Sequence, residues 1–259
     1  MKFAIIVIVA LYANCAYSVP HYDTRVVNGE SAEVGQFPYQ VQLVVTVPQG
    51  RALCGGSLIS DQWVLTAGHC VEKASSFDVR LGAVKFSSDG NADGIVIKAT
   101  KYIRHEKYNP LFAANDVALV QLPEKVTFSD TIQPVKISSG SDLFVGREVV
   151  VSGWGLQHDK GNVAEHLQYA SLNVISNKEC TQTFNPLVVK ATTICAKGPQ
   201  KQSPCQGDSG GPLVLADEGT LVGVVSFGHV LGCEQGFPGA FARITSFASW
   251  ISQKTGIKV

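Results

Sequence analysis

Several common functional signals are missing from this chain of 259 residues. Lys plus Arg and Asp plus Glu both number 21, so no basic surface indicates a nucleic-acid partner. No Asn-x-Ser/Thr sequon occurs, and we therefore expect no N-linked glycan. Repeats and low-complexity tracts are also missing, which excludes a repeat array, and an apolar content of 45% is ample for a folded core.

The most apolar stretch of the chain stands at its N-terminus, where it follows Lys2 and gives way to polar residues at Asn14. This run is too short to span a bilayer, and Ala16 and Ser18 have the spacing that signal peptidase recognises. A membrane anchor is the alternative, but no stop-transfer charges follow the run. We therefore expect a signal peptide over residues 1–18, a secreted, extracellular protein and no membrane partner.

The cysteine count is odd, at seven, but Cys15 lies within the predicted signal peptide. In an oxidising compartment the remaining six can pair into three disulfides, with 15 possible connectivities. A zinc site is the alternative, because His69 stands beside a cysteine. The chain has no CxxC pair and the compartment disfavours free thiolates, so we expect neither a metal nor another cofactor. The six cysteines are Cys54, Cys70, Cys180, Cys195, Cys205 and Cys233.

The hydrophobic pattern has mostly a period of two. Apolar residues alternate from Tyr39 to Val47, as a half-buried strand requires. Similar short runs occupy residues 148–155 and 220–228, and turn residues separate them. The chain is therefore predicted to be mainly β.

Two short helices are predicted among these strands. Near the C-terminus, residues 247–251 have apolar side chains at helical spacing, behind Thr245 or Ser246 as the cap. Ser176 and Glu179 have the spacing of a capping box, which predicts a second short helix. Neither helix is long enough to organise the fold.

The stretch CQGDSGGPLV, residues 205–214, surrounds Ser209 with glycines. Glycine permits tight turns and the close approach of another backbone, so this serine is a candidate nucleophile. A serine hydroxyl needs a base, and His69 directly follows the apolar stretch WVLTAG. Asp116 precedes the apolar stretch VALVQL, where a carboxylate without a partner would be costly. The candidate catalytic residues are therefore His69, Asp116 and Ser209, in that order.

The sequence GDSGG also matches the G-x-S-x-G nucleophile elbow of α/β-hydrolases, which would indicate a lipid esterase. In that fold the acid and the histidine both follow the serine. Only His229 follows Ser209, and the remaining fifty residues are rich in short strands. The chain order of the candidate residues therefore disfavours the elbow.

With TAGHC, NDVAL and GDSGGP in this order, and with SGWG at 152–155 and SFG at 226–228, the chain resembles the chymotrypsin family of serine endopeptidases. The stretches QSPCQGDSGGP and SWISQKTGI are most similar to its secreted arthropod chymotrypsin-like and collagenolytic (brachyurin-like) members. The resemblance implies an all-β fold of two packed antiparallel six-stranded β-barrels with a C-terminal helix. It also implies one serine peptidase domain over residues 26–259, divided into its barrels near residues 135–145.

The resemblance implies a role for each residue of the site. His69 would act as general base and then general acid, and Asp116 would fix its tautomer. The backbone N–H groups of Gly207 and Ser209 would hold the oxyanion. One residue departs from the family, which more often has alanine where Gly68 precedes the histidine. Gly68 adds no polar group to the site, so we expect activity to survive.

The segment VPHYDTR, residues 19–25, resembles a short activation peptide. The resemblance implies cleavage after Arg25 by a trypsin-like protease and insertion of the new Val26 amino group beside Asp208. This buried ion pair would reshape the turn at Gly207, so the protein would be made as an inactive zymogen.

For the primary substrate pocket, the resemblance implies Ser203 at the base and Ser226, Gly228 and Gly239 on the walls. None of these residues is charged, so an open, neutral pocket is predicted. Such a pocket favours cleavage after Phe, Tyr or Leu through burial of the side chain. Broad collagenolytic specificity is the alternative.

An active endopeptidase is the function that these motifs favour. Its expected partners are protein or peptide substrates, an activating trypsin-like protease and protein protease inhibitors, and we expect a monomer. The alternative is a non-catalytic homologue that acts as a binding module. Such proteins usually lack a residue of the triad, and this chain has all three.

Overall fold

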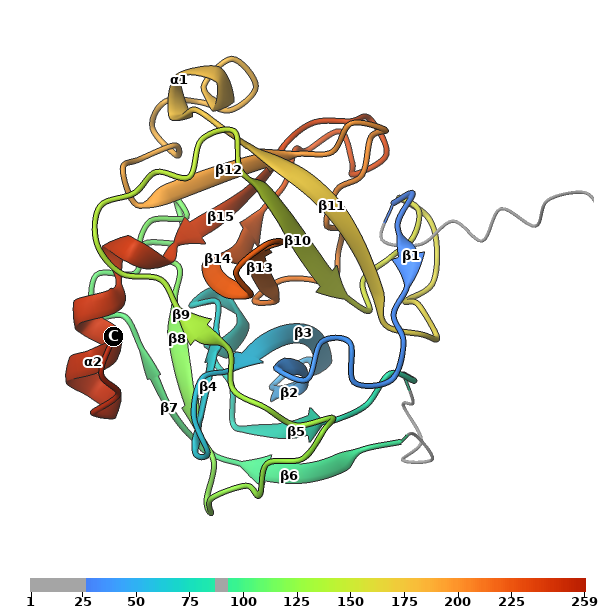
Figure 1. The fold of residues 1–259 in the computed structure, drawn as a ribbon, viewed down its shortest axis with the longest axis vertical. Helices are drawn as coiled ribbons and strands as arrows, with labels where there is room; N and C mark the ends of the chain where they lie inside the picture. Colours follow the sequence, from blue (N-terminus) through green and yellow to red (C-terminus); the bar gives the residue numbers. More distant parts are fainter. Residues whose placement is uncertain (1–26, 87–92) are drawn as a thin grey trace, which may run out of the picture.

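The computed structural model describes residues 27–86 and 93–259 of the chain. The predicted signal peptide, the predicted activation peptide and Val26 lie outside the described residues. Apart from two α-helices and two 3₁₀ turns, the described residues form strands and loops, so the prediction of an all-β fold is confirmed. Figure 1 shows the strands of the two halves of the chain in two groups, one above the other.

The first barrel contains, within the described residues, seven strands: β2 (Gln40–Val47), β3 (Gly50–Leu58), β4 (Trp63–Thr66), β5 (Ser76–Leu81), β6 (Ile95–Ala99), β7 (Lys101–Arg104) and β8 (Ala118–Gln121). They form one antiparallel sheet in the order β6-β5-β2-β3-β4-β8-β7. Thr100 alone separates β6 from β7, so the chain itself joins the two edges of the sheet. Counted as one bent strand, β6 and β7 give the predicted six-stranded barrel.

The second barrel contains, in the part of the chain that the structure describes, eight strands: β1 (Glu30–Ser31), β9 (Lys136–Ile137), β10 (Glu148–Gly153), β11 (Gln168–Ile175), β12 (Thr193–Lys197), β13 (Pro212–Leu215), β14 (Thr220–Phe227) and β15 (Gly239–Arg243). The order is β1-β11-β10-β13-β14-β15-β12, and β12 pairs back onto β11. Six strands therefore close a barrel, as predicted, and the two-residue strands β1 and β9 are additions at β11 and β14.

The alternating pattern of β2 places its apolar side chains inside the first barrel. Val41, Leu43 and Val45 are fully buried there, which confirms the predicted strand. Its other face is buried at Gln40 and Gln42 and partly exposed at Val44 and Thr46. Gln40 accepts a hydrogen bond of 2.6 Å from the Ser152 hydroxyl of β10. The two barrels therefore share a buried polar contact where they meet.

Both predicted helices are present, although one begins later than expected. The Ser176 hydroxyl accepts a hydrogen bond from the Glu179 N–H and caps helix α1 (Asn177–Cys180). Helix α2 (Ala248–Thr255) has no side-chain cap, so the prediction of Thr245 or Ser246 as its cap is wrong. These two residues instead belong to the 3₁₀ turn η2 (Ile244–Ser246), which runs directly into α2. No helix in residues 27–86 and 93–259 is long and apolar enough to cross a membrane.

The contact between the barrels depends on a close approach at Gly55 in β3. A Cβ atom at this position would lie 2.8 Å from the Cα atom of Gly211, so only glycine fits. The N–H of Gly55 donates a hydrogen bond of 2.7 Å to the carbonyl oxygen of Ser209. The turn that carries the candidate nucleophile is thus held directly against the first barrel.

Candidate active site

A buried carboxylate holds the candidate base in place. Asp116, two residues before β8, is only 2% exposed. Its Oδ1 accepts a hydrogen bond of 2.8 Å from the backbone N–H of His69, and its Oδ2 lies 2.8 Å from the imidazole Nδ1. Because an ionised carboxylate only accepts hydrogen bonds, Nδ1 carries the proton and Nε2 is left to accept one.

A third hydrogen bond reaches the same carboxylate from the second barrel. The Ser226 hydroxyl, near the end of β14, donates to Asp116 Oδ2 at 2.6 Å. Three donors offset the cost of burying the charge and hold the carboxylate in one orientation. The family resemblance implied a place for Ser226 in the substrate pocket only. The sequence carried no signal for this contact, because the two residues are 110 positions apart.

The surroundings of His69 favour its protonated form. Burial lowers its pKa, but the hydrogen bond and negative charge of Asp116, with a smaller contribution from Glu72, outweigh burial. The net result is a pKa above the ordinary value of 6.5. The imidazole is thereby suited to receive a proton and to hold it as an imidazolium beside Asp116.

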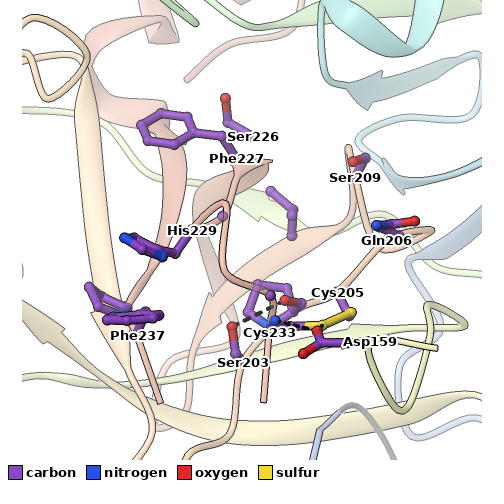
Figure 2. Close-up of a pocket in the computed structure, with 15 residues that line it drawn as sticks. Asp159, Ser203, Cys205, Gln206, Ser209, Ser226, Phe227, His229, Cys233 and Phe237 are labelled. Carbon is purple, nitrogen blue, oxygen red and sulfur yellow. Dashed lines mark hydrogen bonds between the residues drawn. A yellow bond between two sulfur atoms is a disulfide. The ribbon is translucent and has the colours of Figure 1, made fainter. Parts of the chain in front are cut away.

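The candidate nucleophile stands in a turn that requires glycine on both sides. Gly207 and Gly210 have φ angles of +99° and +81°, which other residues rarely adopt. The carbonyl oxygen of Ser209 lies 3.5 Å from the Cys70 sulfur, next to His69 in the chain. Figure 2 shows the Ser209 side chain at the upper edge of a pocket. The turns that carry the serine and the histidine are thus neighbours.

Two backbone N–H groups of this turn are available to a ligand. The N–H groups of Gly207 and Ser209 donate to no other group within the described residues, whereas those of Asp208 and Gly210 donate to backbone carbonyls. A Cβ atom on Gly207 would also lie 3.0 Å from the Cα atom of Gly155. Glycine therefore lets the turn pack closely and leaves both N–H groups open.

Asp208 is fully buried behind this turn. Its carboxylate accepts hydrogen bonds from the backbone N–H groups of Gly155, at 2.7 Å, and Cys205, at 2.9 Å. Burial raises its pKa to about 6, although both hydrogen bonds act in the opposite direction. A Cβ atom on Gly153 would lie 2.1 Å from the carboxylate, so the SGWG stretch supplies the space for it.

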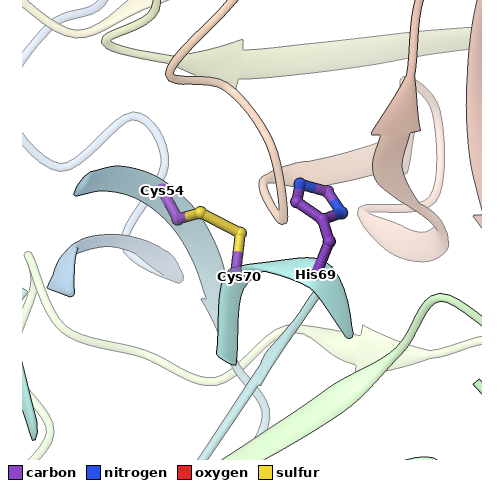
Figure 3. A group of neighbouring side chains, drawn as sticks. All are labelled: Cys54, His69 and Cys70. Atoms are coloured by element: carbon purple, nitrogen blue, oxygen red, sulfur yellow. A yellow bond between two sulfur atoms is a disulfide. The ribbon is translucent and has the colours of Figure 1, made fainter. Parts of the chain in front are cut away.

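Three disulfides join the predicted cysteines, which confirms their number and settles their pairing. The bonds are Cys54–Cys70, Cys180–Cys195 and Cys205–Cys233. Figure 3 shows the first bond, which ties β3 to the 3₁₀ turn η1 (His69–Val71), with the imidazole beside it. Because these sulfurs are joined to each other, this group has no thiolate to offer zinc.

A side chain at Gly68 would make tight contacts with two neighbouring side chains. A Cβ atom there would lie 3.0 Å from the Tyr108 ring and 3.1 Å from Asp116 Oδ1. Burial raises the pKa of Tyr108 to about 12, and the nearby negative charge of Asp116 adds to this effect. Glycine at position 68 thus lets the Tyr108 ring pack closely beside the carboxylate.

A cavity of about 280 Å³ opens beside Ser209, and Figure 2 shows it in close-up. The predicted residues Ser203, Ser226 and Gly228 line it. Ser203 is buried and its hydroxyl donates to the Pro204 carbonyl oxygen at 3.1 Å. A Cβ atom on Gly228 would meet nothing within 4 Å, so this wall stays open. The remaining lining residues are Asp159, Pro204, Cys205, Gln206, Val225, Phe227, His229, Gly232, Cys233, Phe237 and Pro238.

The pocket differs from the expectation in two respects. Gly239 does not line it, because the Pro204 ring lies against this glycine, 3.0 Å from where its Cβ atom would be. Asp159 does line it, so the pocket is not free of charge. Asp159 lies in the loop between β10 and β11, about 50 residues before the nucleophile, and no motif links it to the pocket.

Aromatic side chains that were not predicted to bind substrate also line the pocket. Figure 2 shows the rings of His229 and Phe237 next to each other. Their centroids are 3.8 Å apart. Phe227 packs edge-on against Phe184 at 5.2 Å. Phe227, His229 and Phe237 thus give the cavity apolar ring surface in addition to the carboxylate of Asp159.

Comparison with known proteins agrees with this fold and site. The family model described as Trypsin matches residues 26–251. The chain is 42% identical to a collagenase from Hypoderma lineatum, over 99% of both chains, and 37% identical to brachyurin from Leptuca pugilator, over 90% of this chain and 99% of that protein. A solved structure of HL collagenase superimposes with a TM-score of 0.82 at 43% identity, covering 90% of this chain and 99% of the other.

The fold and these similarities define a serine endopeptidase, a hydrolase whose substrates are proteins or peptides. The chain belongs to the trypsin family. The resemblance to arthropod chymotrypsin-like and collagenolytic members is confirmed, because a collagenase and brachyurin are among its relatives.

Proposed function

We propose that the protein hydrolyses peptide bonds through an acyl-enzyme formed on Ser209, with His69 as the base and Asp116 as its orienting partner. The observation that carries this proposal is the hydrogen-bonded chain from Ser226 to Asp116 to His69, with bonds of 2.6 and 2.8 Å. It selects the tautomer in which Nε2 can accept a proton. The turn that carries Ser209 lies beside it.

In the acylation step, the Ser209 hydroxyl oxygen attacks the carbonyl carbon of the scissile bond while its proton passes to His69 Nε2. Asp116 keeps the imidazole oriented and stabilises the imidazolium. His69 then gives the proton to the leaving amine, and the C–N bond breaks. In deacylation, water replaces the amine and the same proton transfers release the acid.

The negative oxygen formed in both steps would be held by the N–H groups of Gly207 and Ser209. Two observations support this. Neither N–H group donates to another acceptor among the described residues, and Gly207 has the positive φ angle of a tight turn. Losing one such donor costs about 2.7 to 4 kcal/mol of transition-state stabilisation.

Cleavage after large apolar residues such as Phe, Tyr or Leu is the specificity that we propose. The apolar walls from Val225, Phe227 and Phe237 support it, because burial of such a side chain contributes about 1.5 to 3 kcal/mol. Broad collagenolytic specificity is the second candidate, and the relatives named collagenase and brachyurin favour it.

We further propose that the protein is secreted after removal of residues 1–18 and is activated by a trypsin-like protease that cuts after Arg25. The new amino group of Val26 would pair with Asp208. Two observations support this route: Asp208 is fully buried with only backbone N–H donors among the described residues, and Val27 is only 3% exposed. The mature chain, residues 26–259 with its barrels divided near 135–145, would act as a monomer that protein protease inhibitors can block.

A serine-directed phosphonate tests both the nucleophile and the activation step. The precursor and an Arg25→Gln variant are each treated with the activating protease, exposed to the phosphonate and digested for mass spectrometry. We expect the adduct on Ser209 in the cut protein only. A cut protein without an adduct on Ser209 would contradict the catalytic assignment, and a fully labelled Arg25→Gln variant would contradict the activation route.

A further inference from the structure

The substrate pocket combines apolar walls with one carboxylate that the proposed mechanism does not use. Asp159 reaches the pocket from the loop between β10 and β11, whereas Ser203, at the predicted base, is neutral. We propose that Asp159 is a specificity-determining residue that lets the pocket accept arginine or lysine before the cut, in addition to large apolar residues. This inference rests on the proposed function.

The carboxylate of Asp159 is held in place on the wall of the pocket. Its Oδ1 accepts a hydrogen bond of 2.7 Å from the backbone N–H of Cys233. Its own backbone N–H donates to a carboxylate oxygen of Glu234 at 2.8 Å. Gly232 makes room for it, because a Cβ atom there would lie 2.2 Å from Asp159 Oδ2. Two loops thus fix the position of the charge.

The second oxygen of this carboxylate is available to a ligand. Asp159 Oδ2 has no hydrogen-bond donor, and Asp159 forms no ion pair with Lys or Arg, within the described residues. The Ser203 hydroxyl donates its hydrogen bond to the Pro204 carbonyl oxygen, so it does not donate to the Asp159 carboxylate. A cation that enters the pocket would therefore find one acceptor of opposite charge.

The lining of the pocket suits a side chain with an apolar stem and a charged end. Arginine and lysine lay their methylene groups along apolar surfaces and keep the charged group at a polar partner. Val225, Phe227 and Phe237 provide the apolar surface, and Asp159 provides the partner. A charge-assisted hydrogen bond is about twice as strong as a neutral one, which makes this contact large enough to change the choice of substrate.

The competing explanation is that Asp159 only anchors the loop at Gly232 and Cys233. An Asp159→Asn variant separates the two roles, because its amide oxygen can still accept the hydrogen bond from Cys233. We measure kcat/KM for two peptides that differ only in Arg or Phe before the cut. The activating protease is removed first, and a Ser209→Ala preparation treated in the same way gives the background.

We expect wild-type protein to cleave both peptides, and Asp159→Asn to lower the ratio of Arg to Phe cleavage about tenfold or more. Glu234→Gln is the matched control, since it removes a neighbouring negative charge outside the pocket lining, while its amide oxygen can still accept the hydrogen bond from the Asp159 N–H. We expect it to change the ratio less than about twofold. An equal fall of the Arg-to-Phe ratio in both variants, or an unchanged ratio in Asp159→Asn, would overturn the assignment of Asp159 to specificity.

A second measurement needs no variant. Benzamidinium and neutral benzamide have similar shapes, so their competition with the Phe peptide on wild-type protein reports the charge of the pocket alone. We expect the inhibition constant of benzamidinium to be lower than that of benzamide by about tenfold or more. Equal inhibition constants would refute the role of Asp159. Cleavage of the Phe peptide and phosphonate labelling of Ser209 test the proposed peptidase function without involving Asp159. A failure of that function can therefore be distinguished from a failure of the assignment of Asp159.

Discussion

If the proposed activation is correct, the buried carboxylate of Asp208 should have opposite effects on stability before and after cleavage, and an Asp208→Asn variant measures both. In the uncut chain Val26 is bonded to Arg25 and has no free amino group. Asp208 then has only backbone N–H groups as donors among the described residues, and burial raises its pKa to about 6. A carboxyl whose pKa is raised by folding destabilises the fold once it ionises.

The size of the effect follows from the two pKa values. The rise from 3.8 to about 6 corresponds to about 3 kcal/mol, at about 1.36 kcal/mol per pH unit. The penalty is absent below about pH 4, where the carboxyl is protonated in both states, and complete above about pH 6. The free energy of unfolding of the Asp208→Asn precursor, relative to its parent, should therefore rise by about 3 kcal/mol between pH 4 and pH 7.

After cleavage we expect the sign to reverse. In the proposed ion pair the Val26 ammonium would lower the pKa of Asp208, so the ionised carboxylate would stabilise the mature protein above about pH 4. The asparagine variant then loses stability relative to its parent as the pH rises. Denaturant unfolding of the uncut and cut proteins, both carrying Ser209→Ala to prevent self-digestion, measures the two slopes. The same sign in both forms would refute the proposed ion pair.

Two further predictions concern the site itself. Because the Asp116 hydrogen bond and charge outweigh burial and hold the pKa of His69 above 6.5, activity should fall as the pH drops through a midpoint above that value. A pH profile of kcat/KM with an acid midpoint well below 6.5 would contradict this. A Gly155→Ala variant would place a methyl group 2.4 Å from the Asp208 carboxylate, so it should be cut normally after Arg25 yet label with phosphonate at least about tenfold more slowly. A labelling rate equal to that of the wild-type protein would show that the Asp208 carboxylate does not need the space at Gly155.

Local patterns predicted the strands and the candidate catalytic residues. The period-two alternation of β2 was sufficient, because one of its faces fills the first barrel. His69, Asp116 and Ser209 each stand in a short motif, so no knowledge of distant contacts was needed to select them. Helix α2 began later than predicted, because η2 takes the residues that looked like its cap.

Features that depend on contacts between distant segments were beyond the reach of the sequence. The six cysteines allow 15 pairings, and only the fold brings Cys205 to Cys233. The hydrogen bond from Ser226 to Asp116 crosses from one barrel to the other. Asp159 lines the pocket because of the conformation of the loop that carries it. That position depends on the hydrogen bond from Cys233 and on the space left by Gly232.

The central claim is that His69 and Ser209 act as one proton-transfer unit, and the most direct test is to remove them separately and together. We would measure kcat for one peptide with the activated Ser209→Ala, His69→Ala and double variants. Each single variant should lose about 10⁴-fold or more, and the double variant should be no slower than the single ones, because either change breaks the same step. Losses that multiply in the double variant would mean that the two side chains act independently, which would contradict the account.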